Sequence, residues 1–183
     1  MRRLSTALVV VLLASAVGGC FPGEEPDVDG AAQFDRFPIY WLGETFEGHG
    51  LEHISELGAT NPGVMLVYGT CDAGFGYEAR CNAPLQIQVM PLCTHLDAVA
   101  RNQVWRTRKV RGAPVGTIDG APVLFTRRMQ LKVYRGEGSD RGMPRRAFEA
   151  LRSLNSVEPV IAAGGPIPPP PPGVLEGERF CSD

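Results

Sequence analysis

The sequence predicts an α+β fold: a mainly antiparallel sheet with about two helices packed on one face, stapled by disulfides. Three observations lead to this expectation. Several short segments are apolar or alternate apolar with polar residues, which is typical of strands with a buried face. Two later segments repeat apolar residues at helical spacing. Four cysteines follow the N-terminal region, an even number that can form two disulfide bonds.

Five segments have the composition of β-strands. The clearest is residues 84–90, where Gln86 and Gln88 alternate with aliphatic residues, so that one face is buried and the other is wet. Residues 64–69 are continuously apolar, as expected of a central buried strand. The sequence Ile118-Asp119-Gly120-Ala121 predicts a hairpin turn between later strands. The expected strands are 37–43, 64–69, 84–90, 110–118 and 126–135.

Two helices are expected, one after the third strand and one after the last. Thr94 can cap a helix over about residues 94–104, because Asp97 stands three residues further on, in a variant of the capping box. Pro144 fits the first turn of the second helix. The apolar stripe of that helix is Ala147, Phe148, Leu151 and Leu154.

The segment between the first two strands is expected to be mostly loop. Its glycines and the sequence Asn61-Pro62-Gly63 indicate turns. One short helical turn could form where apolar residues recur at Leu51, Ile54 and Leu57.

The first 20 residues have the pattern of an export signal. Two arginines precede the apolar stretch 7–17, which is shorter than the roughly 20 residues that span a membrane. The sequence Val17-Gly18-Gly19-Cys20 then resembles the lipobox of bacterial lipoprotein precursors. That resemblance implies that residues 1–19 are removed by cleavage between Gly19 and Cys20, and that Cys20 receives a lipid. It also implies an exported protein, anchored by this lipid to the outer face of the cell membrane.

The rest of the chain divides into three parts. Residues 20–33 carry four carboxylates and no basic residue, which indicates an acidic tether next to the lipid. Residues 34–160 form the globular α+β domain. Residues 161–183 contain five consecutive prolines and form a stiff polyproline segment. This segment either displays a ligand for an aromatic groove or, as we favour, lies as a strap across the domain and is held by Cys181.

The remaining cysteines are Cys71, Cys81, Cys93 and Cys181, and in an exported chain they indicate disulfide bonds. Four cysteines allow three pairings. We favour Cys71–Cys81, which closes a short loop, and Cys93–Cys181, which ties the tail to the domain. A four-cysteine zinc site is the alternative, but the gaps of nine and eleven residues between the first three cysteines do not match the paired spacing of such sites.

Charge is divided unevenly along the chain. Residues 21–60 contain nine acidic residues and one basic residue, whereas residues 100–152 contain thirteen basic and four acidic residues. The formal net charge of −2 argues against nucleic acid as a partner. The basic half is either a solvated sheet face, partly neutralised by the acidic half, or a face for anionic envelope polymers or lipid headgroups. The candidate residues of this basic face are Arg106, Arg108, Arg111, Arg128 and Lys132.

No motif in the sequence assigns a reaction. His49 and His53 have the spacing of metal ligands on a helix, but the glycines beside His49 make a helix there unfavourable, so neither a metal nor a cofactor is expected. The body resembles uncharacterised exported lipoproteins of high-GC bacteria, whose arginine-rich composition it shares, with sixteen arginines and two lysines. We therefore expect a non-catalytic envelope-binding or scaffolding module. The alternatives are an envelope hydrolase with an unrecognised site and a ligand-binding lipoprotein that serves a transporter.

Replacing the lipid-bearing cysteine tests the anchor. Cys20→Ala removes the thiol that would carry the diacylglyceryl group, so this variant should incorporate no labelled lipid and should be unprocessed or released from the membrane. Labelling of the wild type and the variant with a radioactive fatty acid measures this. A wild-type protein that carries no label would show that the lipobox resemblance is misleading.

Overall fold

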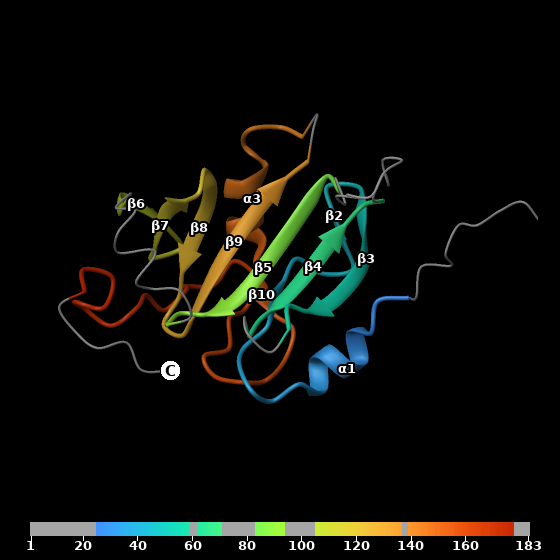
Figure 1. The fold of residues 1–183 in the computed structure, drawn as a ribbon, viewed down its shortest axis with the longest axis horizontal. Coiled ribbons are helices and arrows are strands. Elements are labelled where there is room, and N and C mark those ends of the chain that lie inside the picture. The colour runs from blue at the N-terminus through green and yellow to red at the C-terminus, as the bar shows by residue number, and fades with distance from the viewer. Residues whose placement is uncertain (1–24, 59–61, 71–82, 94–104, 137–138, 178–183) are drawn as a thin grey trace, which may run out of the picture.

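The computed structural model describes residues 25–58, 62–70, 83–93, 105–136 and 139–177 (Figure 1). Eight strands form one antiparallel sheet in the order β2-β3-β4-β5-β9-β8-β7-β6. In chain order they are β2 (Thr45–Phe46), β3 (His49–Glu56), β4 (Val64–Tyr68), β5 (Leu85–Pro91), β6 (Trp105–Val110), β7 (Ala113–Ile118), β8 (Ala121–Phe125) and β9 (Met129–Arg135). A smaller sheet pairs β1 (Tyr40–Trp41) with β10 (Arg152–Ser153).

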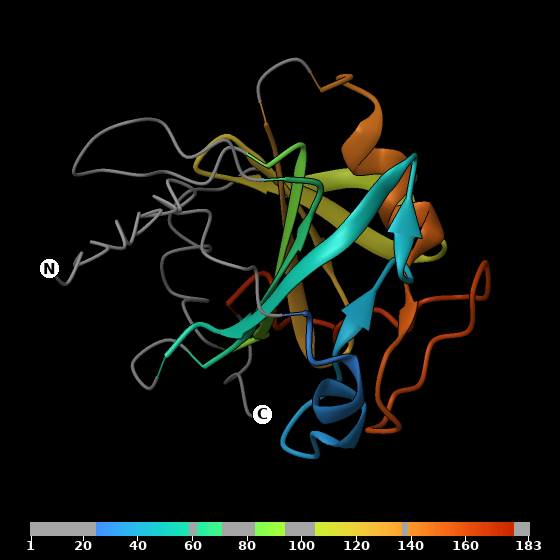
Figure 2. The same cartoon turned by 90° about the vertical axis from the view of Figure 1, so that its right-hand side faces the viewer.

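The expected α+β class is wrong, because the described part of the chain is a β-rich fold. Its helices are α1 (Val28–Gln33) and α3 (Met143–Ala150), which have six and eight residues. They do not lie side by side, although both contact the main core. Helix α3 lies against β9 and β6, whereas α1 lies at the other end of the molecule, near β3 (Figures 1 and 2). The helix expected over residues 94–104 falls outside the described residues.

Tight turns explain why more of the chain is sheet than expected. Glu47 and Gly48 have φ angles of 49° and 84°, the left-handed conformation of a two-residue hairpin turn, so the expected loop forms β2 and β3 instead. Arg111 and Gly112, at 51° and 94°, form a turn near the start of the expected strand 110–118, so that this strand begins at Ala113 as β7, and β6 is an additional strand before the turn. The expected turn at Asp119-Gly120 is confirmed, with φ angles of 49° and 79°.

The main hydrophobic core fills the concave side of the large sheet, whose curvature is visible in Figure 2. Leu66 of β4 pairs with Ile87 of β5, and Ile87 pairs with Val133 of β9, so these side chains point to the same side. Phe148 of α3 and Tyr40 of β1 pack into this core from the opposite side. A smaller apolar cluster on the other face of the sheet contains Leu92, Ile118, Val123, Phe125 and Val174.

Helix α3 begins beside Pro144, as the sequence predicts, and buries Pro144, Ala147 and Phe148. It ends four residues earlier than the apolar stripe suggests. Leu151 has an extended conformation, with φ −53° and ψ 139°, and the chain then continues into β10. The later apolar positions of the stripe therefore contribute to the core from extended backbone.

Both ends of the described chain are packed against the domain. The expected tether of residues 20–33 finishes in α1, whose Val28 and Ala31 contact the main core. In the segment expected to form a strap, Ile167 is buried and its N–H donates to the carbonyl of Arg111 at 2.8 Å. Val174 is buried in the second cluster. The proline-rich segment from 161 to 177 thus lies against the domain.

The expected disulfide stapling is only partly within the described residues. Cys93 is half-buried and disulfide-bonded. Cys71, Cys81 and Cys181 lie outside the described residues, so the structure places no disulfide between two described cysteines. Cys20 and the cleavage site after Gly19 also lie outside them.

Two buried tyrosines join the small sheet to the rest of the domain. The Tyr68 hydroxyl accepts a hydrogen bond from the Leu42 N–H at 2.9 Å and donates to the Gly43 carbonyl at 3.2 Å. The Tyr40 hydroxyl donates to the Pro159 carbonyl at 3.0 Å. Burial raises the pKa of Tyr40 and of Tyr68 from 10.0 to about 12, because the tyrosinate would lose its hydration.

These pKa values predict a loss of stability in alkali. Because the folded pKa is raised, each tyrosine contributes stability that is complete below pH 10 and is lost as the pH rises through about 12. Titration of tyrosinate absorbance should show two groups that ionise late and together with unfolding. Tyr68→Phe should remove one of them, whereas early ionisation of all tyrosines in the folded protein would contradict the prediction.

Candidate functional site

A hollow of about 800 Å³ lies between the β6–β7 hairpin and the beginning of helix α3. Its volume falls in the range of small-molecule binding sites. On the sheet side, Val115 and Thr117 of β7 and Pro122 of β8 line it, and these residues point to the same face of the sheet as the main core. On the helix side, Pro144 and Phe148 form an apolar floor.

Four basic residues with exposed side chains border this hollow: Arg108 and Lys109 come from β6, and Arg141 and Arg145 come from the start of α3. Lys109 pairs with Pro114, so its side chain points to the face of the sheet opposite to that of Val115. We call these four residues the basic cluster. No acidic residue is among the described residues that line the hollow. Arg145 is paired with Glu149 at 2.9 Å, but both side chains are exposed, and such pairs are weak. The other three have no hydrogen-bond or ion-pair partner within the described ranges.

The direction of helix α3 adds to the positive potential of the hollow. Its N-terminus has Gly142 at the cap, no capping side chain and no acidic residue in the first turn. The N-terminal end of a helix carries a partial positive charge, so Arg141 and Arg145 stand where cations are unfavourable. An anion bound in the hollow would interact favourably with the N-terminal end of the helix dipole, and it would reduce the repulsion among the cations of the basic cluster.

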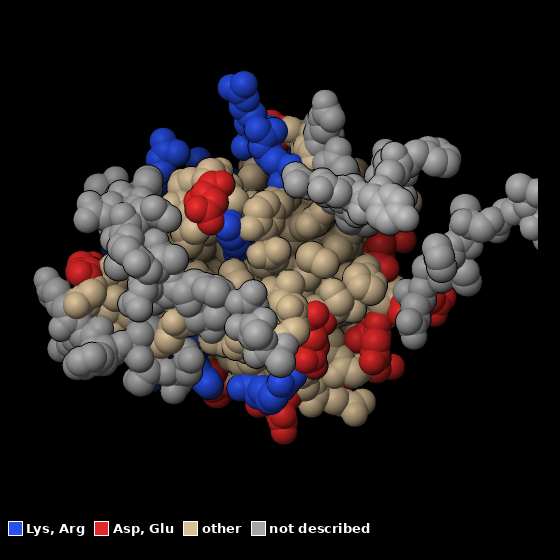
Figure 3. All heavy atoms as spheres, viewed as in Figure 1, with Lys and Arg blue, Asp and Glu red and all other residues tan. Residues whose placement is uncertain are grey.

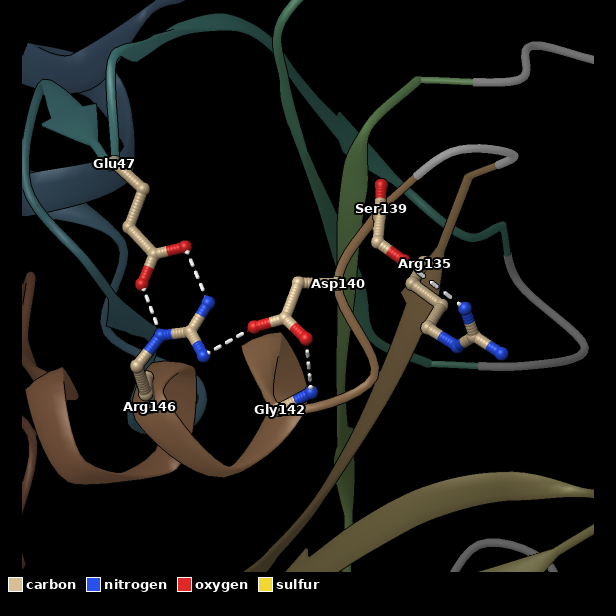
Figure 4. Close-up of polar contacts among 6 residues, drawn as sticks. All are labelled: Glu47, Arg135, Ser139, Asp140, Gly142 and Arg146. Carbon is tan, nitrogen blue, oxygen red and sulfur yellow. Dashed lines mark hydrogen bonds and ion pairs between the residues drawn. The ribbon is translucent and has the colours of Figure 1, made fainter.

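Two nearby carboxylates form no ion pair with the basic cluster within the described residues, because Arg146 binds both of them (Figure 4). Its Nε and Nη2 atoms donate to Glu47, and its Nη1 donates to Asp140. The pKa of Glu47 is lowered by these bonds. That of Asp140 is lowered mainly by the Gly142 N–H that it accepts, and also by Arg146. The network instead joins the β2–β3 hairpin to the start of α3.

The face shown in Figure 3 carries its charges unevenly, although basic and acidic side chains also lie next to each other at the upper left and at the bottom of the view. Basic side chains gather at the top of the view, above the ends of β9 and α3. Several acidic side chains lie at the right and lower right, on the side of β3 and α1. The uneven charge of the sequence is therefore also uneven in space.

The structure does not bring the five predicted basic residues together. Arg108 lines the hollow. Lys132 lies on the opposite face of the sheet, because it pairs with Val123 of the second apolar cluster, and it binds Asp119 at 3.2 Å. Burial alone would lower the pKa of Lys132, but its contacts with Tyr134 and Asp119 raise it overall. Arg128 donates to the Glu158 carbonyl at 3.3 Å, and the side chain of Arg106 is outside the described residues.

Arg111 has a structural role instead of facing a ligand. Its guanidinium donates to four carbonyl oxygens: those of Glu149 and Leu151 at the end of α3, at 3.2 and 2.6 Å, and those of Ala162 and Gly165, at 2.6 and 2.5 Å. Partial burial lowers its pKa, but a guanidinium stays charged. Arg111 thus fixes the β6–β7 turn to α3 and to the C-terminal segment, and so sets the distance between the two walls of the hollow.

Arg141 and Arg145 were not among the predicted candidates. The signal for them was available, since three arginines stand within one helical turn of Pro144. The expected basic face consists of residues from predicted strands, whereas the basic residues of the hollow come from β6 and from the start of α3.

His49 and His53 lie on β3, and no group of three or more possible metal ligands occurs in the described part of the chain. Among the same residues, no helix is long and apolar enough to cross a membrane.

Comparison with protein-family models, with curated proteins and with solved structures finds no match to this chain.

Replacing Arg111 by lysine tests its role. Lysine keeps the charge but cannot present donors in a planar fork, so most of the four bonds would be lost. Arg111→Lys should lower the free energy of unfolding by about 2 kcal/mol, measured by urea denaturation. The exposed Arg127→Lys is the control and should change it by less than about 0.5 kcal/mol. Equal stability of both variants would show that the bonds of Arg111 contribute little.

Proposed function

We propose that this protein is an exported lipoprotein, held at the outer face of the cell membrane by a lipid on Cys20, and that it is a non-catalytic module which binds an anionic envelope ligand. The observation that carries the binding part is the basic cluster around the hollow. The lipobox sequence Val17-Gly18-Gly19-Cys20 supports the anchoring part.

The lining of the hollow suits the recognition of anions. Guanidinium groups present paired N–H donors that match the oxygens of phosphate, sulfate or carboxylate groups. Arg108 and Arg141 have no partner to release within the described residues, so an incoming anion need not compete with an existing ion pair there. Val110 and Val115 are half-buried and offer apolar contact beside these charges.

The electrostatic repulsion within the basic cluster also supports a binding role. Four cations around one hollow repel one another, and two of them oppose the dipole of α3. Any anion that binds the folded state more strongly than the unfolded state will stabilise the protein by mass action. Anion binding should therefore be visible as a rise in the thermal midpoint.

Charge reversal at Arg141 separates binding from folding. In Arg141→Glu a carboxylate replaces a cation at the N-terminus of α3, so the unliganded protein should be as stable as the wild type or more stable, by about 0.3–1 kcal/mol. Its affinity for pyrophosphate should fall about tenfold or more, because a charged hydrogen bond is lost and a repulsion is added. Calorimetric titration with pyrophosphate measures the affinity, and thermal unfolding measures the stability.

Arg127→Glu is the matched control, since it changes the net charge equally. Arg127 is exposed in the turn after β8, at the opposite end of that strand from Pro122, which lines the hollow. This variant should retain the affinity of the wild type for pyrophosphate. Equal losses in the two variants would mean that net charge alone attracts the anion, and a wild type that binds neither pyrophosphate nor any larger anionic probe would refute the proposed function.

A further inference from the structure

The basic hollow and the segment that follows the lipid anchor lie at opposite ends of the domain. Helix α1 packs near Ile54 and Glu56, at the end of β3. The start of α3 instead reaches Glu47, in the turn before β3, through Arg146. The length of β3 separates these two places by roughly 23 Å, at about 3.3 Å per residue. Figures 1 and 2 show α1 and the β6–β7 hairpin far apart in both views.

The position of the proposed anchor shows which of these two ends lies next to the lipid. Only seven residues stand between Cys20 and the start of α1 at Val28, so the chain spans at most about 28 Å from the lipid to the domain. The α1 end is therefore the end of the domain at which the proposed anchor attaches. The basic cluster then lies on the part of the domain that is remote from the anchor.

We infer that the ligand of the hollow is an anionic polymer of the cell envelope, with a phosphate or carboxylate group in each repeating unit, and that the protein links this polymer to the membrane. The inference rests on the proposed function and specifies its ligand. A lipid headgroup is disfavoured because the hollow lies at the end of the domain remote from the attachment point of the anchor. A single small anion is disfavoured because it cannot contact all four cations: Lys109 pairs with Pro114 and points to the face of β6 opposite to that of Arg108, and the other two cations lie at the start of α3.

Several charges on one polymer can bind the cluster together. Once one anionic unit is bound, the next is held near the remaining cations at a high effective concentration, so affinity rises without any new kind of contact. The bound polymer also releases counterions, which makes binding fall steeply with salt. These two properties distinguish a polymer from a single phosphate group.

The test compares four probes on one protein: the mature chain from residue 20 with Cys20→Ser, which carries no lipid. The probes are polyphosphate, polygalacturonate, pyrophosphate, and vesicles of phosphatidylcholine containing phosphatidylglycerol. At least one polymer should bind about tenfold or more tightly than pyrophosphate per anionic group, and the two polymers distinguish phosphate from carboxylate. This binding should fall about tenfold or more between about 50 and 200 mM salt, be lost in Arg141→Glu and persist in Arg127→Glu.

Three outcomes would overturn the inference. Vesicles that bind as tightly as the polymers would identify a lipid headgroup as the ligand, and pyrophosphate that binds as tightly as the polymers would identify a single small anion. Either result leaves the proposed anion-binding function in place. If none of the four probes binds, the proposed function fails together with the inference.

Discussion

The guanidinium of Arg111 is the contact on which the arrangement of the candidate site depends. It stands in a two-residue turn with positive φ, and its bonds reach the last carbonyls of α3 and two carbonyls of the C-terminal segment. Three parts of the chain that are distant in sequence therefore meet at one side chain. Because a hairpin and a helix have no backbone ladder between them, side chains hold them together, and the bonds of Arg111 add to the apolar packing of Phe148 and Ala113. The walls of the hollow keep their spacing as long as this one residue satisfies those carbonyls.

The strands that alternate apolar and polar residues could be predicted from the sequence, and the strands formed around tight turns could not. The alternation in β5 predicts a strand, because every second residue enters the core: Leu85, Ile87 and Val89. By contrast, β3 contains His49, Gly50 and Glu52, a polar composition that indicates a loop. It is a strand because it pairs with β4, and that pairing depends on residues far along the chain. The bias toward an α+β class arose from counting such segments as loops or helices.

The candidate site shows the same limit. The excess of basic residues after residue 100 correctly indicated where cations are frequent, but frequency does not say which side of a sheet they occupy. Lys132 and Arg108 are both on strands, yet Lys132 shares its face with the second apolar cluster while Arg108 lines the hollow on the core side. Arg111 shows a further difficulty, since basic composition does not reveal whether a guanidinium binds a ligand or the protein itself. The N–H groups of Arg111 donate to backbone carbonyls of the same chain. The face of the sheet on which a strand residue lies follows from the pairing register, and composition does not determine the register.

Strand β6 is the last strand of the described sheet, and this position has a consequence for how copies of the protein meet. An edge strand offers unpaired backbone groups to a second molecule, and the risk would grow if the proposed lipid anchor confined the molecules to a surface. Two adjacent cations, Arg108 and Lys109, are exposed on this edge. Two such edges would bring four positive charges together, so neighbouring copies repel at the place where they could otherwise join into a continuous sheet.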